Sequence, residues 1–378
     1  MKIDEITVEG YKSIKSLKNF KLNNINILIG ANGVGKSNFI SIFKMLNFMF
    51  LKNLQQHTQD KGPDSFLYYG RKTTEKIYLE FKFGNNGYSV TLAPTQNNKL
   101  IVERENIKYY SSTEWINTLG TNMLESRLSQ ATKYAYSKKI AQYSLDGIKS
   151  WKLYHFHDTS NTSKIKGVCA ENDNLILKPD ASNISAYLKR LYSEHREYYD
   201  YIVYNISQIA PFFGGFIIRD SENLQLEWFD KSDPDTPLKA HILSDGTLRF
   251  ICLATLLLQP FELMPDTIII DEPELGLHPA ALSLLSELIK RVSDKKQLIL
   301  SSQSVELINN FEPENIIVVD RKNNESMFIC STSYYRQSAY QVRNIFIRYG
   351  NYGSIDRIKD NFQSIAFCIT IFVCSCNI

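Results

Sequence analysis

The chain has 378 residues, of which 43% are hydrophobic and 22% are charged, and these values exclude a disordered or a collagen-like polypeptide. It carries 43 Lys and Arg against 40 Asp and Glu, and the net charge of +3 does not by itself indicate a nucleic-acid-binding protein. The longest strongly apolar run, 365–374, is shorter than the roughly 20 residues that a membrane-spanning helix needs. Together with a charged first segment, this predicts a cytoplasmic protein with no membrane partner.

The first hundred residues predict mainly strands around one glycine-rich loop. Apolar residues alternate with polar ones over 6–17, and a later apolar run ends in a glycine, which indicates strands followed by a loop. Apolar residues spaced three and four apart over 39–50 predict a helix that leaves this loop. Two strands, 76–83 and 88–93, are expected on either side of an Asn-Asn-Gly hairpin signal, and a further strand is expected at 100–104.

The middle of the chain changes in character. From about 105 to 240 the segments are polar and rich in tyrosine, with helical stretches near 123–143 and 184–209. We interpret this part as an inserted, mainly helical lobe. Strand and helix then alternate, as is typical of an α/β fold. These later elements are a buried helix at 243–259, a strand at 267–270, an amphipathic helix at 280–292, and short strands at 297–300 and 315–319.

A phosphate-binding loop is predicted at 30–37. The segment reads Gly-Ala-Asn-Gly-Val-Gly-Lys-Ser and matches G-x-x-x-x-G-K-[ST] between a predicted strand and a predicted helix. Glycines let the backbone turn its N–H groups inward, and the helix start adds its positive dipole end. Lys36 is expected to bridge the β- and γ-phosphates of ATP, and the Ser37 hydroxyl to bind Mg²⁺. The alternative is a glycine-rich turn without a nucleotide. The predicted ATP-binding residues here are Gly30, Asn32, Gly33, Gly35, Lys36, Ser37 and Asn38.

Two acids follow the apolar strand at 267–270. Asp271 is the candidate ligand of Mg²⁺, commonly through water, and Glu272 is the candidate base that orients or deprotonates the attacking water. The carboxyl end of a central parallel strand faces the ligand crevice in such folds. An apolar run followed by Asp-Glu is weak in isolation, but downstream of a phosphate-binding loop it becomes a strong signal.

A serine-glycine loop, 243–247, precedes the buried helix. A polar helix start that contains glycine binds anions through a serine hydroxyl and backbone N–H groups, which makes Ser244 and Gly246 candidate phosphate ligands. The structural alternative is a simple helix cap. The position of this loop, upstream of the acidic pair, favours the functional interpretation.

Together these motifs resemble the ABC-type ATPase heads of the RecF, SMC and overcoming-lysogenization-defect nuclease group. Three longer strings, 154–160, 243–250 and 271–279, are similar to the bacterial RecF-like predicted ATPases often labelled AAA family ATPase. The resemblance covers roughly 1–330. It implies a P-loop NTPase of the ABC/SMC/RecF head type, with a mixed sheet in the N-terminal lobe and a helical insert.

The resemblance also implies how such a head works. Two protomers would meet head to tail, and ATP on the phosphate loop of one would be closed by Ser244 and Gly246 of the other. The four expected segments are then an N-terminal ATPase lobe (1–105), an inserted helical lobe (106–240), a C-terminal lobe with the signature and Walker B motifs (241–330), and an atypical tail (331–378). The tail lacks the acidic, Trp-containing ending associated with the family, and an altered reading frame or a divergent replacement is our hypothesis for it.

One residue of the expected site departs from the pattern of the group, and a histidine pair in one of the similar strings has its own alternatives. Gln303 stands where many ABC-type heads carry a switch histidine, so we expect slow turnover, because an amide hydrogen-bonds water or phosphate but does not change charge. His155 and His157 alternate along a strand and suggest a metal pair, yet no third ligand is apparent nearby. Structural hydrogen bonding is the favoured interpretation for both histidines, and a role at the nucleotide site is the other alternative.

The sequence leaves open which macromolecule the predicted ATPase acts on. No acidic cluster of a metal-dependent nuclease follows Asp320, so cleavage within this chain is not predicted. The resemblance favours duplex DNA in repair or genome maintenance, and the mixture of cations and aromatic residues over 133–139 gives weak support, against a solvated helix face. The alternative is an ATP-dependent switch for a nuclease or another effector protein in phage defence.

Overall fold

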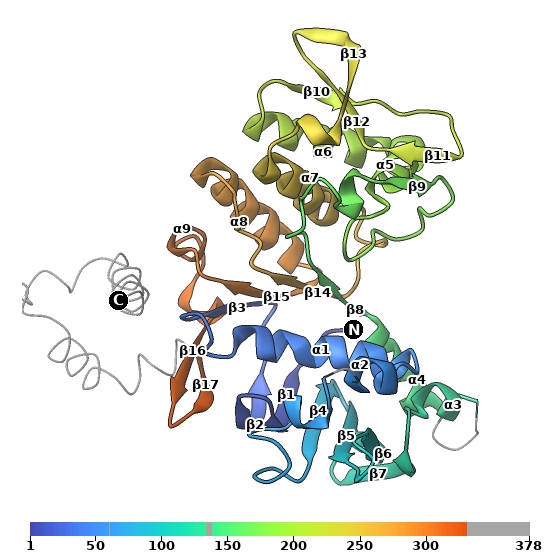
Figure 1. Cartoon of the computed structure of the whole chain (residues 1–378), viewed down its shortest axis with the longest axis vertical. Coiled ribbons are helices and arrows are strands. Elements are labelled where there is room, and N and C mark those ends of the chain that lie inside the picture. Colours follow the sequence, from blue (N-terminus) through green and yellow to red (C-terminus); the bar gives the residue numbers. More distant parts are fainter. Residues whose placement is uncertain (60, 134–137, 331–378) are drawn as a thin grey trace, which may run out of the picture. The chain divides into compact units, whose positions relative to one another are not determined.

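The computed structural model describes residues 1–59, 61–133 and 138–330 (Figure 1). The tail expected at 331–378, with its apolar run, lies outside these residues, as do Tyr134 and Tyr136 of the cation-aromatic segment. The described residues divide into two compact units: unit 1 comprises Met1–Trp151 and the described residues from Phe311 to Cys330, and unit 2 comprises Lys152–Asn310. The segment boundaries expected from the sequence stay a prediction.

Unit 1 contains a six-stranded antiparallel sheet in the order β2-β1-β4-β5-β6-β7. The predicted strands near the N-terminus and the predicted hairpin are confirmed. The strand expected at 100–104 is longer than predicted. The strand of 10 residues that follows it and pairs with it was not expected. The strands are β1 (Glu5–Tyr11), β2 (Ile14–Lys21), β4 (Ile77–Phe83), β5 (Asn86–Pro94), β6 (Leu100–Tyr110) and β7 (Glu114–Met123).

The apolar face of this sheet is covered by helices. In β4 every second residue is buried, as expected for a strand with one face in the core. Helix α1 (Lys36–Phe50) places Phe43 against Phe81 of β4 and against Trp151, with ring centroids 6.1 and 5.2 Å apart. The remaining helices of this unit are α2 (Leu54–Gln59), α3 (Leu128–Ala131) and α4 (Lys138–Lys149).

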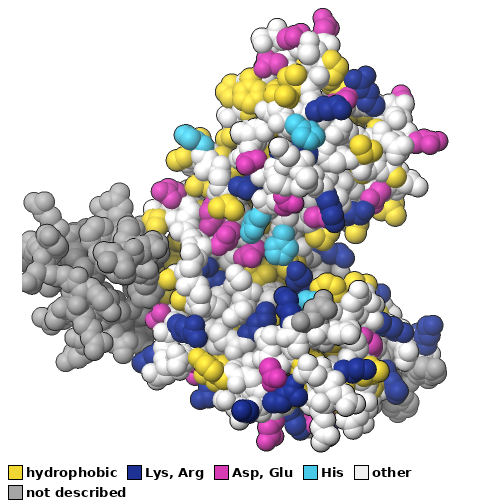
Figure 2. All heavy atoms as spheres, viewed as in Figure 1, with side chains coloured by type: hydrophobic (Ala, Val, Ile, Leu, Met, Phe, Trp, Pro, Cys, Tyr) yellow, Lys and Arg dark blue, Asp and Glu magenta, His cyan; other side chains and the backbone are white. Residues whose placement is uncertain are grey.

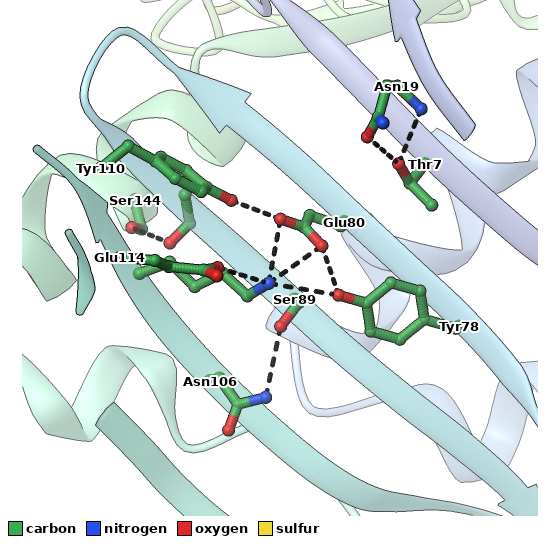
Figure 3. Close-up of polar contacts among 11 residues, drawn as sticks. Thr7, Asn19, Tyr78, Glu80, Ser89, Asn106, Tyr110, Glu114 and Ser144 are labelled. Carbon is green, nitrogen blue, oxygen red and sulfur yellow. Dashed lines mark hydrogen bonds and ion pairs between the residues drawn. The ribbon is translucent and has the colours of Figure 1, made fainter. Parts of the chain in front are cut away.

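The opposite face of the sheet carries a polar network (Figure 3). Lys108 of β6 lies 3.0 Å from both carboxylate oxygens of Glu80 and 3.1 Å from Glu114. The hydroxyls of Tyr78 and Tyr110 donate to the same Glu80 carboxylate. Cross-strand pairs of this kind stabilise a sheet and set its register, so we assign this network to the fold.

Strand β3 (Ile25–Ile29) leads into the predicted phosphate loop. All five of its residues are buried, as expected for a central strand. It pairs in parallel with β16 (Ile316–Lys322), which forms an antiparallel hairpin with β17 (Glu325–Cys330). The first and last described parts of the chain therefore meet beneath the loop.

Unit 2 contains the expected alternation of strand and helix. β14 (Thr267–Asp271) pairs in parallel with β15 (Gln297–Ser302), and Asp271 is opposite Ser301. Three helices accompany these strands: α7 (Asp245–Leu258), α8 (Pro279–Ser293) and the short α9 (Val305–Ile308). The predictions for this part of the chain are confirmed to within a few residues.

The stretch from 106 to 240 contains strands as well as helices, which the sequence patterns did not indicate. The helical stretch expected near 123–143 is found in part, as the short α3 and the first half of α4, while its first residue, Met123, ends β7. The helical stretch at 184–209 is confirmed as α5 (Ile184–Glu194) and α6 (Arg196–Ile209). The other strands here are β8 (Trp151–Tyr154), β9 (Val168–Ala170), β10 (Phe213–Phe216), β11 (Asn223–Gln225), β12 (Glu227–Asp230) and β13 (Asp233–Lys239). Among the described ranges, no helix combines the length and the hydropathy of a membrane span.

Candidate functional site

The predicted phosphate loop is a glycine-shaped turn in unit 1. Gly30, Gly33 and Gly35 have φ values of 155, 79 and 120°, a region that residues with a Cβ rarely adopt. A Cβ on Gly30 would lie 2.1 Å from the Val319 carbonyl oxygen. A Cβ on Gly33 would meet no described atom within 4 Å, and Gly33 is exposed. The loop is thus closed underneath and open at Gly33.

The lysine of the loop folds back over its own turn. Lys36 is 5% exposed, and its Nζ donates to the carbonyl oxygens of Gly30 at 2.6 Å and Ala31 at 3.0 Å. A charged phosphate would be a stronger acceptor for this ammonium than the two carbonyl groups, because hydrogen bonds between charged groups are roughly twice as strong as those to neutral ones. The neighbouring Ser37 and Asn32 are exposed.

A small polar network supports the loop from below. The Ser326 hydroxyl donates to the Val34 carbonyl at 2.5 Å, and its oxygen lies 2.7 Å from the Ser13 hydroxyl oxygen, within hydrogen-bond distance. The Asn38 amide donates to the same Ser13 hydroxyl at 2.7 Å. Of the predicted ATP-binding residues, Asn38 therefore has its side-chain amide on the turn between β1 and β2. A Cβ on Gly35 would lie 2.2 Å from the Ser326 oxygen, so this network also requires glycine at that position.

Each of the two predicted Mg²⁺ ligands carries an oxygen of a type that Mg²⁺ prefers. Ser37 is the second residue of α1 and offers an exposed hydroxyl. Asp271 ends β14, and its Oδ1 accepts a short hydrogen bond from Ser301 Oγ. That bond fixes one carboxylate oxygen and leaves the other outside this contact.

Glu272 follows Asp271 in an uncommon backbone conformation. Its φ is 44°, and its N–H donates to the Ser301 carbonyl at 3.0 Å and to the Ser301 hydroxyl at 3.2 Å. Positive φ at a residue other than glycine costs of order 1–3 kcal/mol and recurs at functional sites. Gln303 Nε2 donates to Glu272 Oε1 at 2.5 Å. The structure therefore brings together the predicted base and the predicted switch residue within unit 2.

The serine-glycine loop has structural roles of its own. Ser244 is the N-cap of α7: its hydroxyl accepts the Thr247 N–H at 3.2 Å and also contacts the Thr247 hydroxyl. A Cβ on Gly246 would lie 2.3 Å from the Gly276 carbonyl oxygen, because the first turn of α7 lies against the loop after β14. Both features fit the cap alternative, and Ser244 is exposed, as a ligand would also require.

The histidine segment is tied to the acidic pair. His157 Nε2 hydrogen-bonds the Asp271 carbonyl oxygen at 2.7 Å. Arg249 of α7 donates to the His157 carbonyl at 2.9 Å and to the Leu275 carbonyl at 2.9 Å. His155 and His157 lie 6.1 Å apart between ring centroids, and within the described part of the chain no group of three His, Cys, Asp or Glu could hold a metal. The favoured interpretation, structural hydrogen bonding, fits His157.

Sequence reasoning did not single out Ser13, Ser326, Ser301, Glu274 or Arg249. Ser13 and Ser326 are 313 positions apart, so no local pattern connects them. Ser301 gave the only usable signal, since it ends an apolar strand beside the strand of the acidic pair. Its contact with Asp271 depends on strand register, which a single sequence does not reveal.

The fold is that of an SMC-type ATPase head, a P-loop NTPase. The crystal structure of an SMC head bound to the C-winged helix domain of ScpA is similar, with a TM-score of 0.54 at 16% identity, and the match covers 87% of this chain and 98% of that one. SMC heads from Thermotoga maritima (TM-score 0.46, 15% identity, 87% and 99% covered) and Pyrococcus furiosus (0.48, 16%, 90% and 99%) are also similar, but no conclusion rests on them.

The family model described as "AAA domain, putative AbiEii toxin, Type IV TA system" matches residues 25–309, most of the chain. The chain belongs to this AAA-domain family. No curated protein matches it.

Proposed function

We propose that this protein is a Mg²⁺-dependent ATPase that hydrolyses ATP to ADP and phosphate. The observation that carries the proposal is the phosphate loop. Its backbone is turned by three glycines at positive φ, it is open at Gly33, and its lysine rests on neutral carbonyl groups. A loop of this form at a helix start is suited to bind the phosphates of a nucleotide.

Each candidate residue has a proposed role. Lys36 neutralises charge on the β- and γ-phosphates, and Ser37 and Asp271 hold the metal, which would supply charge stabilisation at the transferred phosphoryl group. Glu272 orients the attacking water and accepts its proton. Gln303 hydrogen-bonds this base at 2.5 Å and does not titrate, which supports slow turnover.

The proposed working form is a nucleotide-dependent homodimer joined head to tail. Its support is the resemblance to ABC-type heads, together with the exposed position of Ser244 at the start of α7. Ser244 and Gly246 of one protomer would complete the γ-phosphate site of the other. Hydrolysis and dissociation would then be coupled.

Two partners remain as proposals. Duplex DNA follows from the resemblance to RecF and SMC heads. On the face shown in Figure 2, however, Lys and Arg side chains are dispersed among Asp, Glu and uncharged side chains. The second candidate is a regulatory switch for an effector in phage defence, and the AbiEii toxin in the description of the matched family favours it.

Salt titration of binding to duplex DNA, with and without Mg-ATP, separates these two partners. A DNA-acting enzyme is expected to bind with an affinity that falls steeply between about 50 and 200 mM salt. Absence of binding in the ATP-loaded state contradicts the DNA proposal and leaves the effector switch. Release of phosphate from ATP by the wild-type protein, absent in Glu272→Gln, tests the ATPase itself.

A further inference from the structure

The loop after β14 contains a second acid with an unusual environment. Glu274 lies two residues beyond the predicted base, and its Oε1 accepts the backbone N–H of Gln303 at 2.6 Å. Its Oε2 is buried and has no hydrogen-bond partner among the described residues. Burial raises the pKa of the Glu274 carboxyl, and this effect outweighs the lowering by the hydrogen bonds from the Gln303 N–H and the Ser302 side chain.

A carboxyl in such a place is costly for the fold. A buried polar oxygen without a partner costs about 1–3 kcal/mol, and an apolar residue of similar size would avoid that cost. The hydrogen bond of Glu274 Oε1 joins this loop to Gln303 in the loop after β15, 29 positions away in sequence. This contact fixes the backbone of one particular residue, Gln303.

The backbone and the side chain of Gln303 each hydrogen-bond to a different acidic residue. Its backbone N–H is held by Glu274, while its side-chain amide donates to Glu272 Oε1 at 2.5 Å. Glu272 has its own backbone held by Ser301. The Glu272 carboxylate is therefore placed from two sides, and Glu274 sets one of them through Gln303.

We propose that Glu274 is a positioning residue for ATP hydrolysis, which fixes the Gln303 backbone so that the Gln303 amide holds the Glu272 carboxylate in place. The expected effect on kcat rests on the proposed function, whereas the role of Glu274 in fixing the Gln303 backbone does not. A misplacement of about 1 Å in a reacting group can lower a rate by 10²-fold, so a residue of this kind acts on kcat.

The kinetic test compares Glu274→Gln with Glu274→Leu. Glutamine keeps a carbonyl oxygen that can accept the Gln303 N–H, while leucine removes the acceptor. We expect kcat to fall about 10–100-fold in Glu274→Leu and to stay within about threefold of wild type in Glu274→Gln, with KM for ATP nearly unchanged in both. Equal losses in the two variants, or a leucine variant as active as wild type, overturn the proposal.

A double-mutant cycle tests the route through Gln303. If Glu274 acts through Gln303, then Glu274→Leu should lower kcat little further in a Gln303→Ala background. Full additivity of the two losses contradicts this route. Circular dichroism and thermal unfolding of each variant establish that the comparison is made between folded proteins.

Hydrogen exchange gives a readout that needs no ATP hydrolysis. In the nucleotide-free protein, exchange over 300–306 should be faster in Glu274→Leu than in wild type, and Glu274→Gln should match wild type. Unchanged exchange in Glu274→Leu contradicts the positioning contact. A wild-type protein that releases no phosphate would instead refute the proposed function, and the exchange result would still decide the contact.

Discussion

The two units carry their candidate residues in different ways. In unit 1 the proposed phosphate loop is one continuous segment, 30–37, and its backbone is shaped by glycines. In unit 2 the candidates are side chains on separate segments: Glu272 and Glu274 follow β14, Gln303 follows β15, and Ser244 caps α7. This difference shows that a loop shaped by its own backbone can be recognised from one short stretch of sequence. A network of side chains on separate segments can be recognised only when the register of the strands is known.

The largest expected effect is on ATP binding by the proposed phosphate loop. Lys36→Ala should weaken ATP binding by about 100-fold, because it removes a charge-assisted contact to phosphate. Isothermal titration calorimetry with Mg-ATP measures it. The matched control is Lys44→Ala, an exposed lysine on the same helix, which should bind as wild type does. Equal affinity of the Lys36 variant and wild type would refute the phosphate role of the loop.

A glycine substitution separates backbone strain from steric conflict. Gly35→Ala should destabilise unit 1 by about 2–6 kcal/mol, because the new Cβ combines φ 120° with a 2.2 Å approach to Ser326. Gly84→Ala, at φ 56° with no described atom within 4 Å, carries strain alone and should cost about 1 kcal/mol. Chemical denaturation measures both. If Gly35→Ala proved as stable as Gly84→Ala, the Ser326 network beneath the loop would have moved to accommodate the new Cβ, and the steric conflict would be refuted.

Arg249 sharpens the comparison on the side of unit 2. Arg249→Met keeps the stem but loses the bonds to the Leu275 and His157 carbonyls, and should destabilise the protein by about 2 kcal/mol. The control is Arg196→Met, which removes an exposed ion pair with Asp200 and should cost about 0.5 kcal/mol or less. Urea unfolding distinguishes them, and equal losses would deny Arg249 its role in tying α7 to the neighbouring loops.

The last expected effect depends on pH, is smallest near neutral pH, and concerns His57 in unit 1. Burial first, and then the nearby charges of Lys44, Lys61 and Lys12, lower the pKa of His57 to about 4. In the unfolded chain the pKa of His57 is near 6.5, so between about pH 6.5 and 4 the unfolded state binds more protons than the folded state. The free energy of unfolding should therefore fall as the pH falls through this range. His57→Phe, which keeps the ring stacked on Phe48, should show a weaker pH dependence over this window. Identical slopes in unfolding experiments from pH 4 to 7 would contradict this assignment.

Much of the fold could be predicted from periodicity and motif alone. The strand before the phosphate loop, the helix after it, the hairpin of β4 and β5, and the strands and helices after residue 243 follow from apolar spacing and turn residues. The longer strands of 106–240 were missed, because β7 is an exposed edge strand without apolar alternation and β13 is exposed along almost its whole length. Edge strands of this kind leave little trace in a hydrophobicity pattern.

The candidate site could be predicted only where chemistry is local. Lys36, Asp271 and Glu272 stand in short motifs, while the contact of Gln303 with Glu272 joins residues 31 positions apart. The supports of these residues, Ser326 beneath the loop and Glu274 beside the base, are ordinary residue types at unremarkable positions. Only packing gives them a role, so no spacing rule could have selected them.

The central claim is that two copies of this chain are joined by ATP. The most direct measurement is the mass of Glu272→Gln by size-exclusion chromatography with light scattering, with and without Mg-ATP. The account predicts a monomer without nucleotide and a dimer with saturating Mg-ATP, and it predicts no dimer when Lys36→Ala is added. A mass that is unchanged by nucleotide would contradict it.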